Sequence, residues 1–135
     1  MALVEVNLLA VLVAAVLNML IGALWYSPLL FAERWMALVG KTPDGLRGSM
    51  IRGYVLSFVG ALVMALVLAQ IITLMQARLL LEGVLVGFLV WLGFVVTTSS
   101  TTVLFEGRSL ELHAINSGYQ LAALIVMGGL LAVWV

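Results

Sequence analysis

The sequence of 135 residues has no cysteine, one histidine and few charges, with six Asp or Glu and six Lys or Arg. The lack of cysteine excludes disulfides, thiolate metal sites and cysteine nucleophiles. A single histidine cannot build a histidine-rich metal site. Charged residues make up 9 % of the chain, whereas a soluble domain has about 25 %. Soluble enzymes, nucleic-acid-binding proteins and disordered chains are therefore excluded, and we expect neither a metal nor a cofactor.

Hydrophobic residues make up 65 % of the chain and form four long runs. A helix of about 20 apolar residues spans the hydrocarbon core of a bilayer, so each run predicts a membrane-spanning helix. The runs do not alternate between polar and apolar residues as the strands of membrane β-barrels do. We predict one all-α membrane domain over residues 1–135, an antiparallel bundle with spans at about 6–26, 50–74, 82–105 and 112–134.

A short amphipathic helix is predicted at 28–39, between the first two spans. Ser27 suits an N-cap and Pro28 the first helical position. Phe31 and Trp35 share one face at helical spacing, which is typical of a helix that lies in the headgroup plane. The alternative is that this segment only extends the first span.

Basic residues predict the orientation of the spans, because cytoplasmic connections carry an excess of Lys and Arg. Five of the six basic residues flank the first and third connections: Arg34, Lys41, Arg47, Arg52 and Arg108. We therefore expect these connections to be cytoplasmic, with both termini outside an inner (plasma) membrane. At the cytoplasmic level we expect an inner rim formed by Trp25, Tyr26, Trp35, Glu106, Arg108 and His113.

Small residues mark candidate helix contacts, since helices in lipid associate where their backbones can approach closely. In the second span they recur every four positions, at Gly53, Ser57, Ala61, Ala65, Ala69 and Thr73. Gly22 in the first span and Gly83 and Gly87 in the third are further candidates. These faces meet either within one subunit or between subunits. For the glycine pairs, the general abundance of glycine in membrane helices is an alternative explanation.

Uncharged polar side chains gather in the halves of the four spans that face one leaflet. They include Asn18, Ser57, Thr97, Thr98, Thr101, Asn116, Tyr119 and Gln120. Polar groups inside a membrane are costly and mark a bundle interior or a cavity. We predict a polar pocket open to the cytoplasm, with hydrogen bonds that merely join the helices as the alternative. Because the six hydroxyls of residues 97–102 surround their helix, some must bond to carbonyls one turn earlier.

His113 lies at a span end beside Glu111. It is either a proton relay or an exposed interfacial histidine, and its position favours the latter. No carboxylate lies in the middle of a span, which counts against a proton-coupled exporter of the small multidrug type. The zinc, nucleophile-elbow and phosphate-loop motifs of known enzymes are missing from the sequence. We therefore do not expect an enzyme.

Two segments carry a resemblance to a known family. The first runs GALWYSPLLF over 22–31 and is followed by Trp35, and the second joins LFEGRS at 104–109 with INSGYQ at 115–120. With them the chain resembles a family of small prokaryotic membrane proteins catalogued only as a conserved domain of unknown function. The resemblance implies four spans and supplies no activity, substrate or cofactor. Its motif positions are Asn7, Gly22, Trp25, Tyr26, Pro28, Trp35, Glu106, Gly107, Arg108, Asn116 and Tyr119.

Three functional classes stay open. The first is a transporter or channel for a small neutral polar or amphipathic solute, which would need a homodimer or larger assembly because four short helices enclose little space. The second is a structural or accessory subunit that packs against other membrane proteins. The third, an enzyme acting on lipid, has no motif in its favour. We also expect the turn at Gly107 to need a positive φ and to pack against the amphipathic helix.

Overall fold

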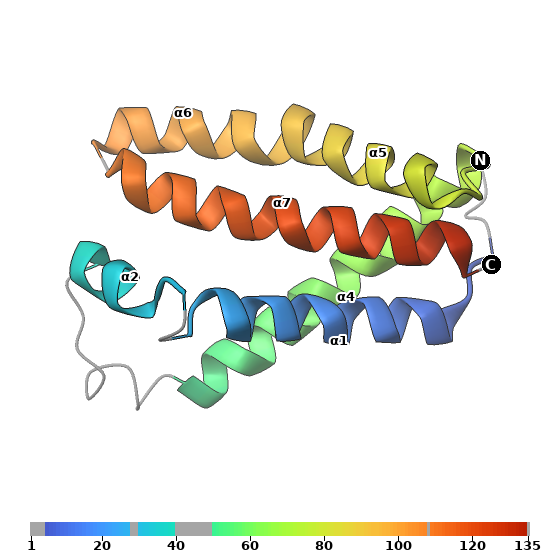
Figure 1. Ribbon diagram of the computed structural model, residues 1–135, viewed down its shortest axis with the longest axis horizontal. Helices are drawn as coiled ribbons and strands as arrows, with labels where there is room; N and C mark the ends of the chain where they lie inside the picture. Colours follow the sequence, from blue (N-terminus) through green and yellow to red (C-terminus); the bar gives the residue numbers. More distant parts are fainter. Residues whose placement is uncertain (1–4, 28–29, 40–49, 108, 135) are drawn as a thin grey trace.

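The computed structural model describes residues 5–27, 30–39, 50–107 and 109–134, which form helices joined by short turns (Figure 1). Four helices are long and apolar enough to cross a membrane. They are α1 (Leu8–Trp25), α4 (Met50–Leu74), the continuous helix over Leu80–Glu106, and α7 (Leu110–Val133). The protein is thus an all-α membrane protein, as its apolar runs predict, and each span lies within two residues of its expected bounds.

Side chains and turns fix the ends of these helices. The Asn7 side chain accepts hydrogen bonds from the backbone N–H groups of Leu9 and Ala10, which caps the start of α1. Ser109 caps α7 in the same way through Leu112. Gly107 joins α6 to α7 with φ at 67°, the left-handed conformation that the sequence predicts for this turn.

The short helix between the first two spans is α2 (Ala32–Val39). It begins later than the predicted residue 28, and residues 28 and 29 lie outside the described part of the chain. The Ser27 hydroxyl donates to the Leu24 carbonyl at 2.6 Å. The Ser27 hydroxyl proton therefore closes the last turn of α1, and the predicted helix start at Pro28 lies outside the described residues.

The third span is one helix with a change of winding in its middle. It consists of α5 (Leu80–Val90), the π-helical segment η1 (Trp91–Val96) and α6 (Thr97–Glu106). A π turn holds more residues than an α turn, so it changes which face of the helix continues toward a neighbour. Among the described elements α5 and α7 have the most extensive contact, whereas α6 touches α7 only sparsely (Figure 1).

The contact between α5 and α7 is a backbone-to-backbone contact. A Cβ atom placed on Gly83 would lie 2.1 Å from the Gly128 carbonyl oxygen, and one on Gly87 would lie 2.2 Å from the Leu124 carbonyl oxygen. Only glycine fits at either position, and both were expected from the sequence to pack against a helix. This contact leaves no space between α5 and α7. It lies at the end of the bundle where α1 begins and α7 ends, which we call the terminal end.

About half of the small residues in the ladder on α4 lie in a contact with another helix. Ala61, Ala65 and Ala69 are buried, as expected for a contact face. Gly53 and Ser57 are exposed, although they continue the same ladder, because α4 crosses α1 obliquely and leaves the bundle there (Figure 1). The opposite end of the bundle, which carries α2 and the Gly107 turn, is called the connection end below.

We expect Gly83→Ala to lower the free energy of unfolding by about 1–3 kcal/mol, because the added methyl group forces α5 away from α7. Gly60→Ala is the matched control, since a Cβ atom there meets nothing within 4 Å and alanine is the better helix former. Unfolding of the purified protein in detergent micelles measures both effects. Equal stability of the two variants would contradict the close contact.

Candidate functional site

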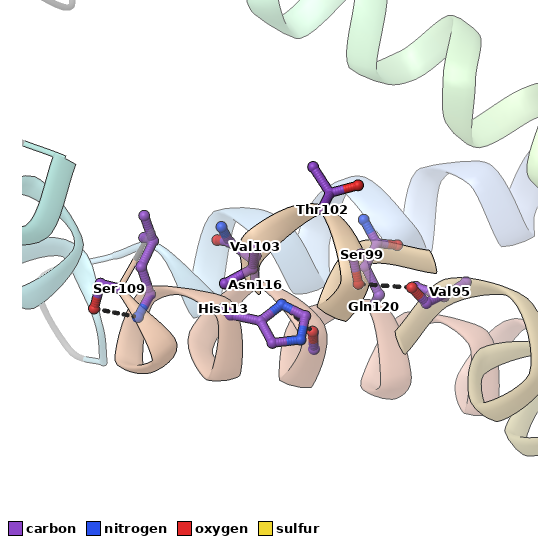
Figure 2. Close-up of a pocket in the computed structure, with 10 residues that line it drawn as sticks. Val95, Ser99, Thr102, Val103, Ser109, His113, Asn116 and Gln120 are labelled. Carbon is purple, nitrogen blue, oxygen red and sulfur yellow. Dashed lines mark hydrogen bonds between the residues drawn. The ribbon is translucent and has the colours of Figure 1, made fainter. Parts of the chain in front are cut away.

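A polar cavity of about 330 Å³ lies between α6 and α7 at the connection end (Figure 2). Its polar walls come from the two helices and the residue that caps α7. The lining residues are Val95, Ser99, Thr102, Val103, Ser109, Leu112, His113, Asn116, Ser117 and Gln120. The cavity exists because α6 diverges from α7 beyond the π-helical segment, in the half of the membrane where the sequence predicts a polar pocket.

The α6 wall presents hydrogen-bond acceptors. The Ser99 hydroxyl donates to the Val95 carbonyl at 2.6 Å, and the Thr102 hydroxyl donates to the Thr98 carbonyl at 3.2 Å. Each hydroxyl has a single proton, and that proton is used within the helix. The lone pairs that remain on the two oxygens can accept hydrogen bonds from a molecule in the cavity.

The α7 wall presents donors. The Asn116 side-chain oxygen accepts from the Tyr26 hydroxyl at 2.6 Å, so the NH₂ group of Asn116 keeps its two donor hydrogens. The Ser109 hydroxyl accepts from the Leu112 N–H at 3.2 Å and keeps its own proton. Gln120 adds an amide beside Ser99 (Figure 2). The α7 wall therefore offers donors as well as amide and hydroxyl acceptors, and the α6 wall offers acceptors.

His113 lies in the cavity wall and is half-buried, whereas the sequence favoured an exposed interfacial histidine. Its Nε2 lies 2.8 Å from the Ser100 hydroxyl and its Nδ1 lies 3.2 Å from the Ser117 hydroxyl. A neutral imidazole has one donor and one acceptor nitrogen, so the three groups form a directional chain. Ser100 is the only hydroxyl of residues 97–102 that bonds to another helix, which ties α6 to α7.

Asn18 and Tyr119, which the sequence assigned to the pocket, lie instead in the helix core. Asn18 is 2 % exposed, and its side-chain oxygen accepts from the Tyr119 hydroxyl. Its NH₂ group donates to the sulfur atoms of Met64 and Met127, at 3.9 and 3.8 Å. These bonds join α1, α4 and α7, so Asn18 holds helices together and does not line the cavity.

The remaining members of the predicted pocket face outward. Thr97, Thr98 and Thr101 are exposed, and each hydroxyl donates to a carbonyl four residues earlier. This is the bonding that the consecutive hydroxyls require, because they cannot all face one cavity. Ser57 is exposed on the part of α4 that leaves the bundle. Of the predicted set, Asn116 and Gln120 line the cavity.

Aromatic rings close the connection end of α1 against α7. The Trp25 indole N–H donates to the Ile115 carbonyl at 2.9 Å. The Tyr26 ring lies 5.8 Å from that of Trp35 and 5.6 Å from that of Tyr119, centroid to centroid, with edge-on geometry. Such edge-on ring pairs contribute a favourable interaction energy in addition to that of the apolar area they bury. They fix Tyr26, and with it the hydrogen bond that orients Asn116.

Two glycines make room for these rings. A Cβ atom on Gly22 would lie 3.2 Å from the Tyr119 hydroxyl oxygen. One on Gly118 would lie 2.9 Å from the Trp25 ring. Gly22 is a predicted packing position, and here its partner is a side chain on α7.

An ion pair joins α2 to the start of α7, outside the lining of the cavity. Arg34 donates to both carboxylate oxygens of Glu111 at 2.5 Å. This hydrogen-bonded carboxylate raises the pKa of the Arg34 guanidinium, so the group is charged at every physiological pH. The sequence predicted instead that α2 meets the turn at 106–108. Glu106 is the last residue of α6, and Arg108 lies outside the described residues.

Sequence reasoning missed Ser99, Thr102, Ser109 and Ser117 as cavity residues. The first two belong to a run in which every position is a hydroxyl, so periodicity gives no face. Ser109 alone carried a recognisable signal, because a serine before an apolar helical run is typical of an N-cap.

The chemistry of the site is that of neutral hydrogen bonding. Among the described residues that line the cavity there is no carboxylate, guanidinium or ammonium group. Nor do the described residues contain a cluster of three or more His, Cys, Asp or Glu side chains able to hold a metal ion. The described lining thus presents hydroxyl, amide and imidazole groups.

Comparison with known proteins places nearly the whole chain in one family. Residues 9–132 match the family described as "Protein of unknown function (DUF1761)". This confirms the resemblance carried by the two sequence motifs. No curated protein and no solved structure matches the chain.

Because the chain lacks cysteine, single cysteines can probe the cavity directly. We expect Ser99→Cys and Gln120→Cys to react with a charged, water-soluble thiol reagent in membranes, since both positions line the cavity. Thr98→Cys and Thr101→Cys are the matched controls on the outward faces of the same helix, and lipid should protect them. Equal labelling at all four positions would contradict a water-accessible cavity.

Proposed function

The chain belongs to the DUF1761 family, and we propose that it is a non-enzymatic transport component for a small, uncharged polar solute, acting as a homo-oligomer. One observation carries this proposal: a polar cavity, lined without any charged group among its described residues, lies inside a membrane-spanning helix pair. Buried polar groups are costly in lipid. The groups in this cavity are hydrogen-bonded to the protein and still keep unused lone pairs and N–H or O–H donors, which suits a polar occupant.

The hydrogen-bonding groups define the class of solute. Ser99 and Thr102 offer acceptor lone pairs, while Asn116 and Ser109 offer donor hydrogens. A molecule that both donates and accepts, such as a polyol or an amide, satisfies both walls. An ion would lose its hydration without gaining an opposite charge, so we propose neutral solutes.

A second copy of the chain is part of the proposal, because the cavity does not continue through one copy. Beyond the π-helical segment toward the terminal end, the seam between α5 and α7 is closed by contacts of Gly83 and Gly87 with the backbone of α7. Phe94 and Phe105, on the third span, leave large exposed apolar faces beside the sparsely covered α6. A second copy packed on α6 would wall the open side of the cavity and extend the polar route.

We expect liposomes containing the protein to take up urea or glycerol faster than protein-free liposomes, as measured by stopped-flow light scattering. Gln120→Leu should reduce the protein-dependent rate about 2- to 10-fold, the effect of losing one neutral hydrogen bond. Thr101→Val is the matched control, since its hydroxyl faces outward and bonds within its own helix. Permeability equal to that of empty liposomes for every solute would overturn the transport proposal.

An accessory role is the second candidate, and the free end of the α4 ladder favours it. A Cβ atom on Gly53, the first residue of the ladder, meets nothing within 4 Å, although small residues in membrane helices usually mark close contacts. The partner in this case is another membrane protein whose helix packs along that face.

The two candidates predict different complexes in mild detergent. Transport predicts a homo-oligomer whose mass does not change in Gly53→Leu. The accessory role predicts a complex with a different polypeptide that is lost in Gly53→Leu and kept in Gly93→Leu. Gly93 is the matched control because it is also exposed and also has open space around it, on the third span.

A further inference from the structure

A second polar cavity lies at the terminal end of the bundle, where α1, α4 and α7 meet. Its volume is about 270 Å³, and its polar lining consists of Glu5, Asn7, Thr73, Arg78 and Trp134. These residues lie at the ends of the spans, at the level where a membrane meets water. The cavity is separate from the His113 cavity, with which it shares no lining residue.

This second cavity carries one acidic and one basic side chain that do not pair with each other. The described residues form an ion pair at contact distance between Arg34 and Glu111, and none between Glu5 and Arg78. Both side chains nevertheless line the same cavity, Glu5 from the segment before α1 and Arg78 from the turn after α4. A carboxylate and a guanidinium therefore face one space with room between them.

Among the described residues, the groups beside Arg78 leave most of its guanidinium donors unused. Arg78 donates one guanidinium N–H to the Ala77 carbonyl at 3.3 Å, which uses one of its five donors. Glu82, the nearest acid in sequence, accepts from the backbone N–H groups of Arg78 and Leu79 at 3.0 Å. The Oε1 atom of Glu82 therefore bonds to backbone N–H groups before α5, and these bonds do not involve the Arg78 guanidinium.

The rest of the lining suits a polar molecule with a cationic part. The Asn7 side-chain oxygen caps α1, so its NH₂ group keeps two donor hydrogens for the cavity. Trp134 contributes an indole ring, and the face of an indole attracts ammonium groups. A cavity of this volume lies at or below the lower end of the range for drug-sized ligands, so its occupant is small.

We propose that this cavity binds a small zwitterion, with its ammonium group toward Glu5 and its carboxylate or phosphate toward Arg78. The guanidinium fork matches the two oxygens of either anion. A zwitterion neutralises both side chains at once, whereas a singly charged molecule leaves one of them unpaired. The site is independent of the proposed solute cavity. Two sources share this chemistry: the phosphoethanolamine headgroup of a lipid, and a free amino acid.

Binding is tested with the purified protein in bilayer discs of anionic phosphatidylglycerol. Titration with glycerophosphoethanolamine, whose phosphodiester carries one negative charge, and with glycine is compared with ethanolamine and with acetate, which each carry one charge of the pair. We expect the zwitterions to bind about tenfold or more tightly than their halves, since a hydrogen bond to a charged group changes affinity by at least that factor. Equal binding of zwitterions and halves would overturn the proposal.

Variants connect the binding to the two charges. We expect Glu5→Gln and Arg78→Gln each to weaken zwitterion binding about tenfold, and the exchange Glu5→Arg with Arg78→Glu to restore it. Arg34→Gln removes a basic group at the other end of the bundle and should leave binding unchanged. Loss of binding in Arg34→Gln, or full binding in Arg78→Gln, would overturn the site. Because Glu5 and Arg78 are exposed, we expect unchanged thermal unfolding in these variants.

Native mass spectrometry separates the two sources. Retention of phosphatidylethanolamine over phosphatidylglycerol by the wild type, and its loss in Arg78→Gln, assigns the site to a lipid headgroup. Binding of free glycine without such retention assigns it to a free amino acid. Absence of both would refute the zwitterion site, while urea and glycerol uptake would still test the other cavity separately.

Discussion

The backbone contact between α5 and α7 sets the geometry of the rest of the protein. Gly83 and Gly128 approach so closely that a single methyl group would collide with a carbonyl oxygen. In lipid there is no hydrophobic force between helices, so this kind of close packing is a main source of cohesion. It places α7 in the centre of the bundle, in contact with α1, α4 and α5.

The same contact also decides where space can open. It holds α5 against α7 up to the π-helical segment, where the Trp91 indole donates to the Ser117 carbonyl at 2.9 Å. Beyond that point α6 is tied to α7 by the bond between Ser100 and His113. Loose contact along α6 leaves the cavity, and the hydroxyls in its wall are already satisfied by their own helix. The polar surface is therefore stable without an occupant and still able to bind one.

Much of the fold follows from the sequence because a bilayer permits few backbone structures. Four apolar runs had to become helices, since lipid offers no partner for backbone groups. Gly107 was predictable as a left-handed turn, and Gly83 and Gly87 as contact positions. Asn18 and Tyr119 were recognisable as costly polar residues in a span. Their role was not recognisable from the sequence. A polar side chain that lines a cavity and one that joins two helices look the same there, because both are polar residues within an apolar span.

The spans, the short helix between the first two and the membrane half in which polar groups gather could be read from the residues, because these features depend on local composition and spacing. Which hydroxyls of residues 97–102 face α7 depends on the packing of the helices, because the π-helical segment changes the face that α6 turns toward α7. The tertiary structure also decided that Glu5 and Arg78 share one cavity. Those two residues are distant in sequence, and their meeting depends on how α1, α4 and α7 pack.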